Sequence, residues 1–499
     1  MNFLKRHDTF IYLSGLIVIA AVLRIIFYSG HIFSDDAYYD FLSYTFYKGN
    51  FAQSYIGYPH YPLRINLYIL TALMFKLFGT NEWATTVMPM IYSLASIVLA
   101  YFCAETFSKS KQIARICAFL IAFLPTEIVF ASINFSDAPS TLFINAGIFL
   151  LYLAWKNKNY RLSILSGICF VLSFHFKMNI FFIVLLLLAL FIFDRIKNRN
   201  TNYHILIVLF AVALCFFTEA CIYFVVKGDF FYRLTLIEQN SLYGKHEFFT
   251  LGSVLGYADE SRFWPELVKL IFIKNMKYLF LRRFYLFIPL VALVQSIISI
   301  RKRQNHLLIF WFLGLALLFV AFTVSLQRYQ PMVLRLSWYL FPIFLPAGIL
   351  SACFINSMHK YFRYVLILLY IYGSIIMCQQ YWVFFNHRHN DEFKNFLKTH
   401  TGQTIYSDHY TKYSIDLIDG YRQPLRTARI SGEDFNLLAI PGNSLVVYVP
   451  NHISELEKQG HQYPAFDVLI SNNFRLIFQS GIFNIYERIK KNNLNSADP

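Results

Sequence analysis

Charged residues are scarce in this sequence, and acidic ones are the scarcest. Only 14% of the 499 residues are Asp, Glu, Lys or Arg, against roughly 25% in soluble globular domains. Hydrophobic residues make up 57%, and the mean hydropathy is +0.47, so a single water-soluble core does not fit. The 28 acidic residues leave a formal net charge of +16. In a soluble protein this charge would suggest a nucleic-acid partner, but the basic residues lie between hydrophobic segments, so the partner we expect is a lipid bilayer and not nucleic acid.

Cysteines and common catalytic motifs are also few. The seven cysteines all lie inside apolar stretches, with no CxxC pair or metal-ligand spacing, so we interpret them as small apolar residues within helices. The motifs HExxH, Walker A and GxSxG do not occur, which gives no support to zincin chemistry or nucleotide-driven transport. No residue cluster demands a metal, and a divalent cation is left open.

Long apolar runs are abundant, and they predict about eleven transmembrane helices. The first run is about 20 residues long and has no small-residue cleavage site after it, which predicts a retained helix and not a signal peptide. The predicted spans cover residues 9–28, 84–107, 112–131, 138–155, 161–175, 178–194, 204–226, 283–300, 306–325, 336–355 and 361–382.

Basic residues are concentrated in every second predicted loop, as a chain with eleven spans requires. Every second loop is short and carries at least two of them, which places the N-terminus and these loops in the cytoplasm. The bulky polar segments then share the opposite face: a loop at 29–83, a second at 227–282 and a tail from about 386. We therefore predict a transmembrane domain at 1–385 and a soluble extracytoplasmic domain at 386–499.

The polar segments are predicted to be folded. Apolar residues at helical spacing in 36–48 and 63–78 predict two helices in the first loop, lying at the membrane interface. The tail has β-like runs at 404–407, 444–449, 475–479 and 483–487, with helical stretches near 391–399 and 452–459. The predicted fold is mainly α and polytopic, with a small α/β domain at the C-terminus.

Acidic residues near the outer membrane surface are candidates for chemistry. Asp35 and Asp36 closely follow the first span, beside the aromatic Tyr39; they could act on a substrate or merely begin a helix. Asp137 at the mouth of the fourth span could be functional or a helix cap. Glu219 lies deep in the 204–226 span, where an ionisable group is expensive, and its alternative role is a structural hydrogen bond.

Basic residues are few on the outer face and suit phosphate binding. Their alternative role is lipid headgroup contact or snorkelling. His60 lies between the two loop helices, and a lone histidine is weak evidence for a metal. The outer-face cations include Arg64, Lys177, Arg262, Arg282, Arg283, Arg328 and Arg335.

Several local motifs occur in an informative order. The chain has Ser34-Asp35-Asp36-Ala37-Tyr38-Tyr39, then Pro59-His60-Tyr61-Pro62-Leu63, Leu77-Phe78-Gly79-Thr80-Asn81-Glu82-Trp83, Ser136-Asp137-Ala138-Pro139 and Lys177 after a short helix. In this order and topology, the chain resembles the C-type glycosyltransferase superfamily of integral membrane enzymes. The resemblance is to the branch of protein O-mannosyltransferases and lipid A aminoarabinose transferases, and it is clear over about residues 1–200. Asp36 replaces the commoner Glu, and the Glu-Lys-Pro segment of the aminoarabinose transferases is absent near His60, which weakens the case for that sugar.

The resemblance implies an inverting hexosyl or pentosyl transferase that uses a polyprenyl-phosphate-linked sugar. The acceptor would be a hydroxyl of lipid A, a surface glycan or a protein. Separately from the resemblance, the many Asn, Lys and Ile residues favour a bacterial inner membrane as the location. Asp35 would be the general base, with Asp36 and Asp137 orienting it or the acceptor. The implied phosphate ligands are Lys177, Arg64 and Arg335, and the implied substrate contacts are His60, Tyr39 and Glu219.

Two other functions remain open from the residues. A flippase for lipid-linked sugar would also need an outward cavity with arginines, but it predicts charges buried mid-membrane and often an inverted repeat. A glycan polymerase or ligase would rely on Arg and His in a late outer loop. The two alternatives predict that Asp35→Asn is tolerated, whereas a transferase requires loss of transfer.

Overall fold

The computed structural model divides into two compact units, which we describe separately. The membrane unit comprises Met1–Tyr28, Pro62–Leu67 and Pro89–Gln379, and the α/β unit comprises Ser29–Tyr61, Tyr68–Met88 and Gln380–Pro499. The domain boundary at residue 385 stays a prediction. The residues described are 2–50, 61–178, 180–198, 202–243, 260–321, 334, 337–422, 427–430, 432, 435–458, 462–470 and 473–489.

Helices occupy all eleven predicted spans, which confirms a mainly helical, multi-pass membrane fold. Five of the described helices are long and apolar enough to cross a bilayer alone, and the bent pair Lys111–Ala122 and Pro125–Ser132 makes a sixth candidate span. The others are shorter or less uniformly apolar. The eleven are α1 (Asn2–Ile26), α4 (Glu82–Ser108), α5 (Lys111–Ala122) with α6 (Pro125–Val129), α7 (Asp137–Asn157), α8 (Tyr160–Phe176), α9 (Ile180–Asn198), α10 (Tyr203–Lys227), α15 (Ile288–Arg301), α16 (His306–Val320), α17 (Phe341–Ser357) and α18 (Lys360–Phe384).

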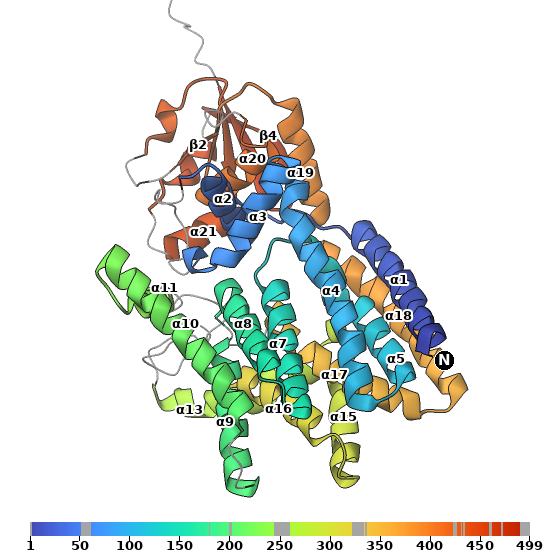
Figure 1. Ribbon diagram of the computed structural model, residues 1–499. Coiled ribbons are helices and arrows are strands. Elements are labelled where there is room, and N and C mark those ends of the chain that lie inside the picture. The colour runs from blue at the N-terminus through green and yellow to red at the C-terminus, as the bar shows by residue number, and fades with distance from the viewer. Residues whose placement is uncertain are drawn as a thin grey trace, which may run out of the picture. The chain divides into compact units, whose positions relative to one another are not determined.

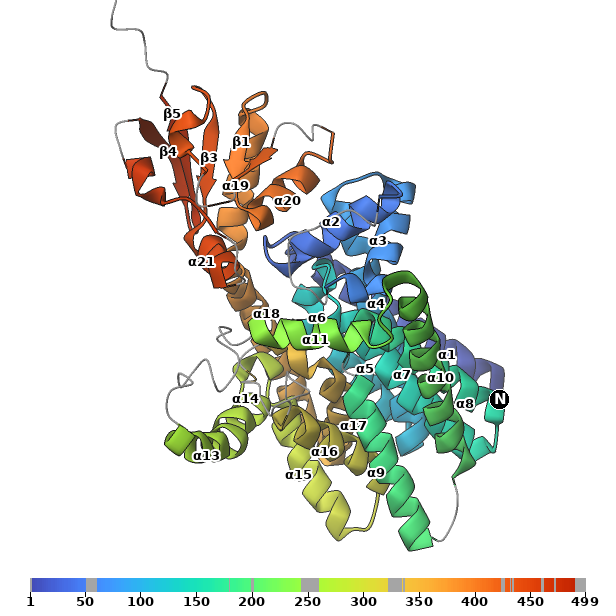
Figure 2. The same cartoon turned by 90° about the vertical axis from the view of Figure 1, so that its left-hand side faces the viewer.

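Small residues let neighbouring spans approach closely in the membrane unit. Helices α7, α8 and α10 lie side by side (Figures 1 and 2). A Cβ atom at Gly147 of α7 would lie 2.7 Å from the ring of Phe170 in α8, and one at Gly167 would lie 2.7 Å from Ala211 in α10. Such close contacts replace the hydrophobic effect as the force that holds helices together in lipid. They bring α7, α8 and α10 together near the middle of α7 and α8.

The segment between α10 and α15, predicted as the second large outer loop, is largely helical in its described parts. After α10 comes α11 (Tyr232–Tyr243), and then α13 (Glu260–Lys269), a π-helical turn at Leu270–Asn275 and α14 (Met276–Phe280) lead towards α15. A buried amide secures this turn, since Asn275 donates to the carbonyl of Val320 (3.0 Å) and accepts from the N–H of Leu334 (3.0 Å).

The α/β unit contains a five-stranded sheet of order β2-β1-β3-β5-β4. The first three strands of this order are parallel, and β5 is antiparallel to both β3 and β4. Sequence reasoning predicted four of these strands and two of the three helices, but it missed β2 and α20. Helix α20 was missed because its buried face consists largely of tyrosines and polar residues. The elements are α19 (His387–Thr399), β1 (Ile405–Ser407), α20 (His409–Ile418), β2 (Thr427–Arg429), β3 (Leu445–Tyr448), α21 (Pro450–Lys458), β4 (Phe474–Ser480) and β5 (Phe483–Arg488).

The segment between α1 and α4, predicted as the first outer loop, contributes two helices to this same unit. The predicted helices are present as α2 (Asp35–Tyr47) and α3 (Ile65–Phe78), whereas their placement at the membrane interface stays a prediction. Helix α2 packs against α20: Phe41 stacks on Tyr413 with ring centroids 4.0 Å apart, and Tyr44 stacks on Tyr421 at 3.7 Å. The acidic loop and the C-terminal segment therefore form one compact body.

Candidate active site

Asp35 and Asp36 begin α2, but their surroundings differ. Asp35 is half-buried, whereas Asp36 is 1% exposed. The Asp36 carboxylate accepts hydrogen bonds from the backbone N–H groups of Ile32 (2.6 Å) and Ser34 (2.7 Å). These bonds fix the loop that leads into α2. Asp36 thus holds the backbone, and Asp35 is the member of the pair with partial access to solvent, as a general base requires.

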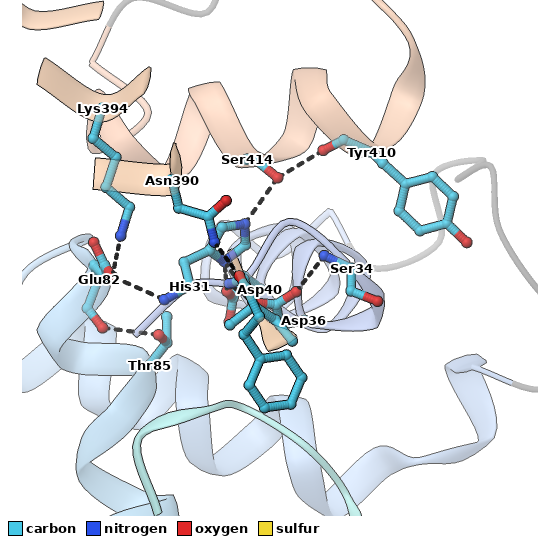
Figure 3. Close-up of polar contacts among 12 residues, drawn as sticks. His31, Ser34, Asp36, Asp40, Glu82, Thr85, Asn390, Lys394, Tyr410 and Ser414 are labelled. Carbon is cyan, nitrogen blue, oxygen red and sulfur yellow. Dashed lines mark hydrogen bonds and ion pairs between the residues drawn. The ribbon is translucent and has the colours of Figure 1, made fainter. Parts of the chain in front are cut away.

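A buried histidine, which sequence reasoning missed, lies beside this pair (Figure 3). His31 Nδ1 is 3.0 Å from Asp40 Oδ2 and 3.1 Å from Asp36 Oδ2, and Nε2 is 2.8 Å from Ser414 Oγ. Burial lowers the pKa of His31, but the Asp36 and Asp40 carboxylates outweigh burial, so the pKa is raised above its ordinary value. The four-residue spacing of Asp36 and Asp40 on one helix face was the signal that could have revealed this cluster.

Glu82, the first residue of α4, adds a further carboxylate (Figure 3). Its Oε1 accepts from the backbone N–H of His31 (2.8 Å) and from Lys394 Nζ of α19 (2.7 Å). Carboxylates outnumber cations here. We call this group the acidic cluster: Asp35, Asp36, Asp40 and Glu82, with His31 and Lys394.

Aromatic rings surround the start of α2. Tyr39 is 1% exposed, and its ring centroid lies 5.0 Å from that of Tyr61. Tyr38 is also buried, 4.5 Å from the ring of Tyr410 in α20. Its burial raises the pKa of the Tyr38 hydroxyl well above the ordinary value. These rings pack the helix in place, and the role of Tyr39 as a substrate contact stays a prediction.

In the membrane unit, Asp137 and Lys177 form a buried ion pair. Asp137 begins α7, and Lys177 directly follows α8. Lys177 Nζ also lies 4.6 Å from the ring centroid of Tyr339. The carboxylate and the ring face both favour the charged ammonium. An ammonium group has three N–H donors and no acceptor, so its chemistry suits an anionic ligand.

Arg64 lies next to this pair. Its Nη1 donates to Ser136 Oγ at 2.9 Å, and Ser136 immediately precedes Asp137. The structure therefore brings together Arg64, Asp137 and Lys177, which were predicted separately from the sequence. We call these three residues the phosphate cluster, because two cations at the start of a helix suit a phosphate group.

Glu219 has a strong partner that sequence reasoning did not identify. Arg233 of α11 grips its carboxylate through two nitrogens, with Nε at 2.9 Å. The Arg233 guanidinium carbon lies 4.2 Å from the ring centroid of Phe174, and His175 Nε2 lies 3.8 Å from Glu219. This pairing satisfies a costly charge within a span. The role of Glu219 as a substrate contact stays a prediction.

The other predicted cations lie elsewhere. Arg282 and Arg283 lie over the ring of Phe284, with guanidinium carbons 5.5 and 5.8 Å from its centroid. Among the described residues, no group of three His, Cys, Asp or Glu is arranged to hold a metal ion. His60, Arg328, Arg335 and the side chain of Arg262 fall outside what the structure describes.

Comparison with known proteins supports the fold derived above. A family model described as dolichyl-phosphate-mannose-protein mannosyltransferase matches residues 65–223, a range with Asp137 and Lys177 but not Asp35. The structure is similar to ArnT from Cupriavidus metallidurans bound to undecaprenyl phosphate and to ArnT in the apo state, at 10% and 12% sequence identity. Each match has a TM-score of 0.57 and covers 96% of this chain and 98% of ArnT. A search of curated proteins by sequence finds no match.

Identity this low establishes the fold alone. The chain has the fold of the C-type membrane glycosyltransferases, and the resemblance predicted from its motifs is confirmed at that level.

Proposed function

We propose that this protein is a membrane glycosyltransferase that moves a sugar from a polyprenyl-phosphate donor to a hydroxyl group of a cell-envelope acceptor. The acceptor classes are lipid A, a surface glycan and a protein. The observation that carries the proposal is the position of Asp35. It is a half-buried carboxylate at the start of α2, nine positions after the end of α1, in a fold similar to that of ArnT, whose crystal structure was solved bound to undecaprenyl phosphate.

Asp35 acts as the general base in this proposal. Its carboxylate takes the proton of the acceptor hydroxyl as the oxygen attacks the anomeric carbon of the donor. The bond from that carbon to the phosphate oxygen breaks, and the lipid phosphate leaves with the electron pair. One base and one direct displacement predict inversion at the anomeric carbon.

The phosphate cluster stabilises the leaving group. Lys177 and Arg64 offer charged N–H donors to the phosphate as negative charge develops on it, and Arg335 is a predicted third donor. Asp137 keeps Lys177 charged and oriented. A phosphate is a good leaving group, so no separate general acid is needed.

The site is proposed to face away from the cytoplasm of a bacterial inner membrane. The alternation of basic loops favours a cytoplasmic N-terminus and an extracytoplasmic C-terminal segment. This orientation puts Asp35 on the side where lipid-linked sugars meet envelope acceptors.

Purified protein in detergent, given a panel of undecaprenyl-phosphate sugars and candidate acceptors, tests the proposal by release of undecaprenyl phosphate. We expect turnover of one sugar in the wild type and its loss in Asp35→Asn. Asp391→Asn is the matched control, because Asp391 lies on the surface of α19 with a side chain 52% exposed. If no donor releases undecaprenyl phosphate and the protein moves lipid-linked sugar between leaflets, the flippase function would replace the proposed transferase function.

A further inference from the structure

The loop before Asp35 is built into the core of the α/β unit. Phe33 is 1% exposed, and its ring centroid lies 5.5 Å from that of Phe393 and 5.1 Å from that of Phe483. Its φ is 59°, a left-handed conformation that is rare for a bulky residue. Such strain persists only where the surroundings over-determine the backbone. Core packing of α19 and β5 therefore imposes the path of the loop that carries Asp35.

His31 makes a second attachment on the same loop (Figure 3). It joins Asp40 of α2 to Ser414 of α20, and its own N–H is held by Glu82. With Phe33 and Asp36, this holds three residues that lie within four positions of Asp35 in sequence. The contacts to α20 and α19 come from segments more than 350 positions away along the chain.

A proton on both ring nitrogens of His31 accounts for all of these contacts. The Ser414 hydroxyl can donate to the carbonyl of Tyr410 at 2.7 Å and accept from Nε2, while Nδ1 donates to the Asp40 carboxylate. The charged imidazolium then lies between two buried carboxylates, which compensates part of their charge.

We propose that His31 is the positioning residue for Asp35: its imidazolium bridges α2 to α20 and so holds the catalytic carboxylate in its working geometry. The inference rests on the proposed function of Asp35. It makes the C-terminal segment part of the catalytic scaffold and not a separable cap. A displacement of about 1 Å at a reacting group costs up to roughly a hundredfold in rate, so the bridge acts on kcat.

Variants on both sides of the bridge test this inference. Ser414→Ala removes the acceptor on α20 and leaves a residue that favours helix. His31→Ala removes the bridge entirely. His31→Gln keeps a donor near the Nε2 position but loses the charge. We expect kcat to fall roughly 10- to 100-fold in His31→Ala, less in Ser414→Ala, and to recover in part in His31→Gln, with donor KM unchanged in all three.

His389→Gln is the matched control. His389 Nδ1 bonds Ser480 Oγ at 2.7 Å, a histidine–serine bond in the same unit that does not touch the acidic loop. We expect wild-type kcat for this variant. A fall in kcat equal to that of His31→Gln would mean that any such bond merely stabilises the unit, and would overturn the inference.

The pH profile separates positioning from simple stability. Wild-type kcat should decline as pH rises through the pKa of His31, and this alkaline limb should be absent in His31→Gln. The charged groups that face His31 are Asp36 and Asp40 of α2, Glu82 of α4 and Lys394 of α19. An alkaline limb that is unchanged in His31→Gln would overturn the inference.

Hydrogen exchange at residues 31–36 provides a readout that does not depend on turnover. We expect faster exchange there in His31→Ala and Ser414→Ala, with the sheet strands unchanged. Unchanged exchange in His31→Ala would refute the bridge. If the wild type turned over no donor, the proposed function would fail, while faster exchange would still support the bridge as a structural device. Full kcat in His31→Ala beside an inactive Asp35→Asn would reject only the positioning role.

Discussion

The membrane unit and the α/β unit differ in how the carboxylates of their candidate sites are compensated. In the membrane unit, Asp137 and Glu219 each face a basic side chain, Lys177 and Arg233 respectively. In the α/β unit, the three carboxylates of Asp36, Asp40 and Glu82 share His31 and Lys394, and backbone N–H groups donate to Asp36 and Glu82.

This difference follows from the surroundings of each cluster. An unpaired charge within a bilayer is costly, so a span retains a carboxylate where a cation from another segment neutralises it. In the α/β unit, backbone N–H groups hold Asp36, while the neighbouring Asp35 keeps partial access to solvent. This difference supports the proposal that Asp35 acts as the base and that Lys177 and Arg64 bind the donor phosphate.

Asp35→Asn and Asp36→Asn should have the most unequal effects in the molecule. Loss of a general base lowers turnover by about 10²–10⁴-fold, so we expect that loss in Asp35→Asn with an unchanged melting temperature. Asp36→Asn removes the charge beside His31 and weakens two backbone hydrogen bonds, so it should destabilise the protein by about 1–3 kcal/mol with a smaller effect on turnover. Donor kinetics and thermal unfolding measure both. Equal losses of turnover would contradict the assignment of the base to Asp35.

Lys177→Met tests whether the phosphate cluster binds donor or only balances charge. It leaves Asp137 buried and unpaired, which should destabilise the protein by about 3–5 kcal/mol and raise the donor KM. The double variant Asp137→Asn/Lys177→Met should regain most of the stability but not the donor affinity. Titration of donor binding and thermal unfolding of the same variants distinguish a donor-binding role of Lys177 from a purely structural one. Recovery of donor affinity in the double variant would limit Lys177 to a structural role.

Arg233→Met applies the same stability argument to the second pair. Arg233 is 7% exposed and is held by Glu219 and by the ring of Phe174. We expect a loss of up to about 3–5 kcal/mol, and a recovery when Glu219→Gln is added. Denaturation of single and double variants checks this coupling. Additive losses would show that the two residues do not act as a pair.

The pH dependence of stability should be the smallest of these effects, and it tests the charge of His31 in the acidic cluster. Because the pKa of His31 is raised in the folded state, its contribution to stability is complete below the unfolded pKa and is lost as pH rises through the folded pKa. The wild type should therefore lose more thermal stability than His31→Gln between acidic and alkaline buffer. Parallel curves for the two proteins would remove His31 as the titrating group.

The apolar runs correctly predicted the helices, and the alternating tail correctly predicted most strands, because both signals are local periodicities. Helix α20 was missed because a buried face of Tyr410, Tyr413 and polar residues lacks that signal. Asp35 and Lys177 were selected from their positions beside spans. His31 and Arg233 were not, because their partners Ser414 and Glu219 lie in other segments; the spacing of Asp36 and Asp40 indicated only one side of the His31 cluster.

The sequence alone determined the class of fold, since a bilayer imposes a minimum apolar length on every span and basic residues mark alternate loops. It also determined which acidic residues lie directly after the first span. Only the tertiary structure decided that His31 meets Ser414, 383 positions away, that Phe33 enters the core between Phe393 and Phe483, and that Arg64 joins Asp137 and Lys177. Contacts between distant segments arise from complementary packing of whole surfaces, and a local pattern of residues does not encode which surfaces meet.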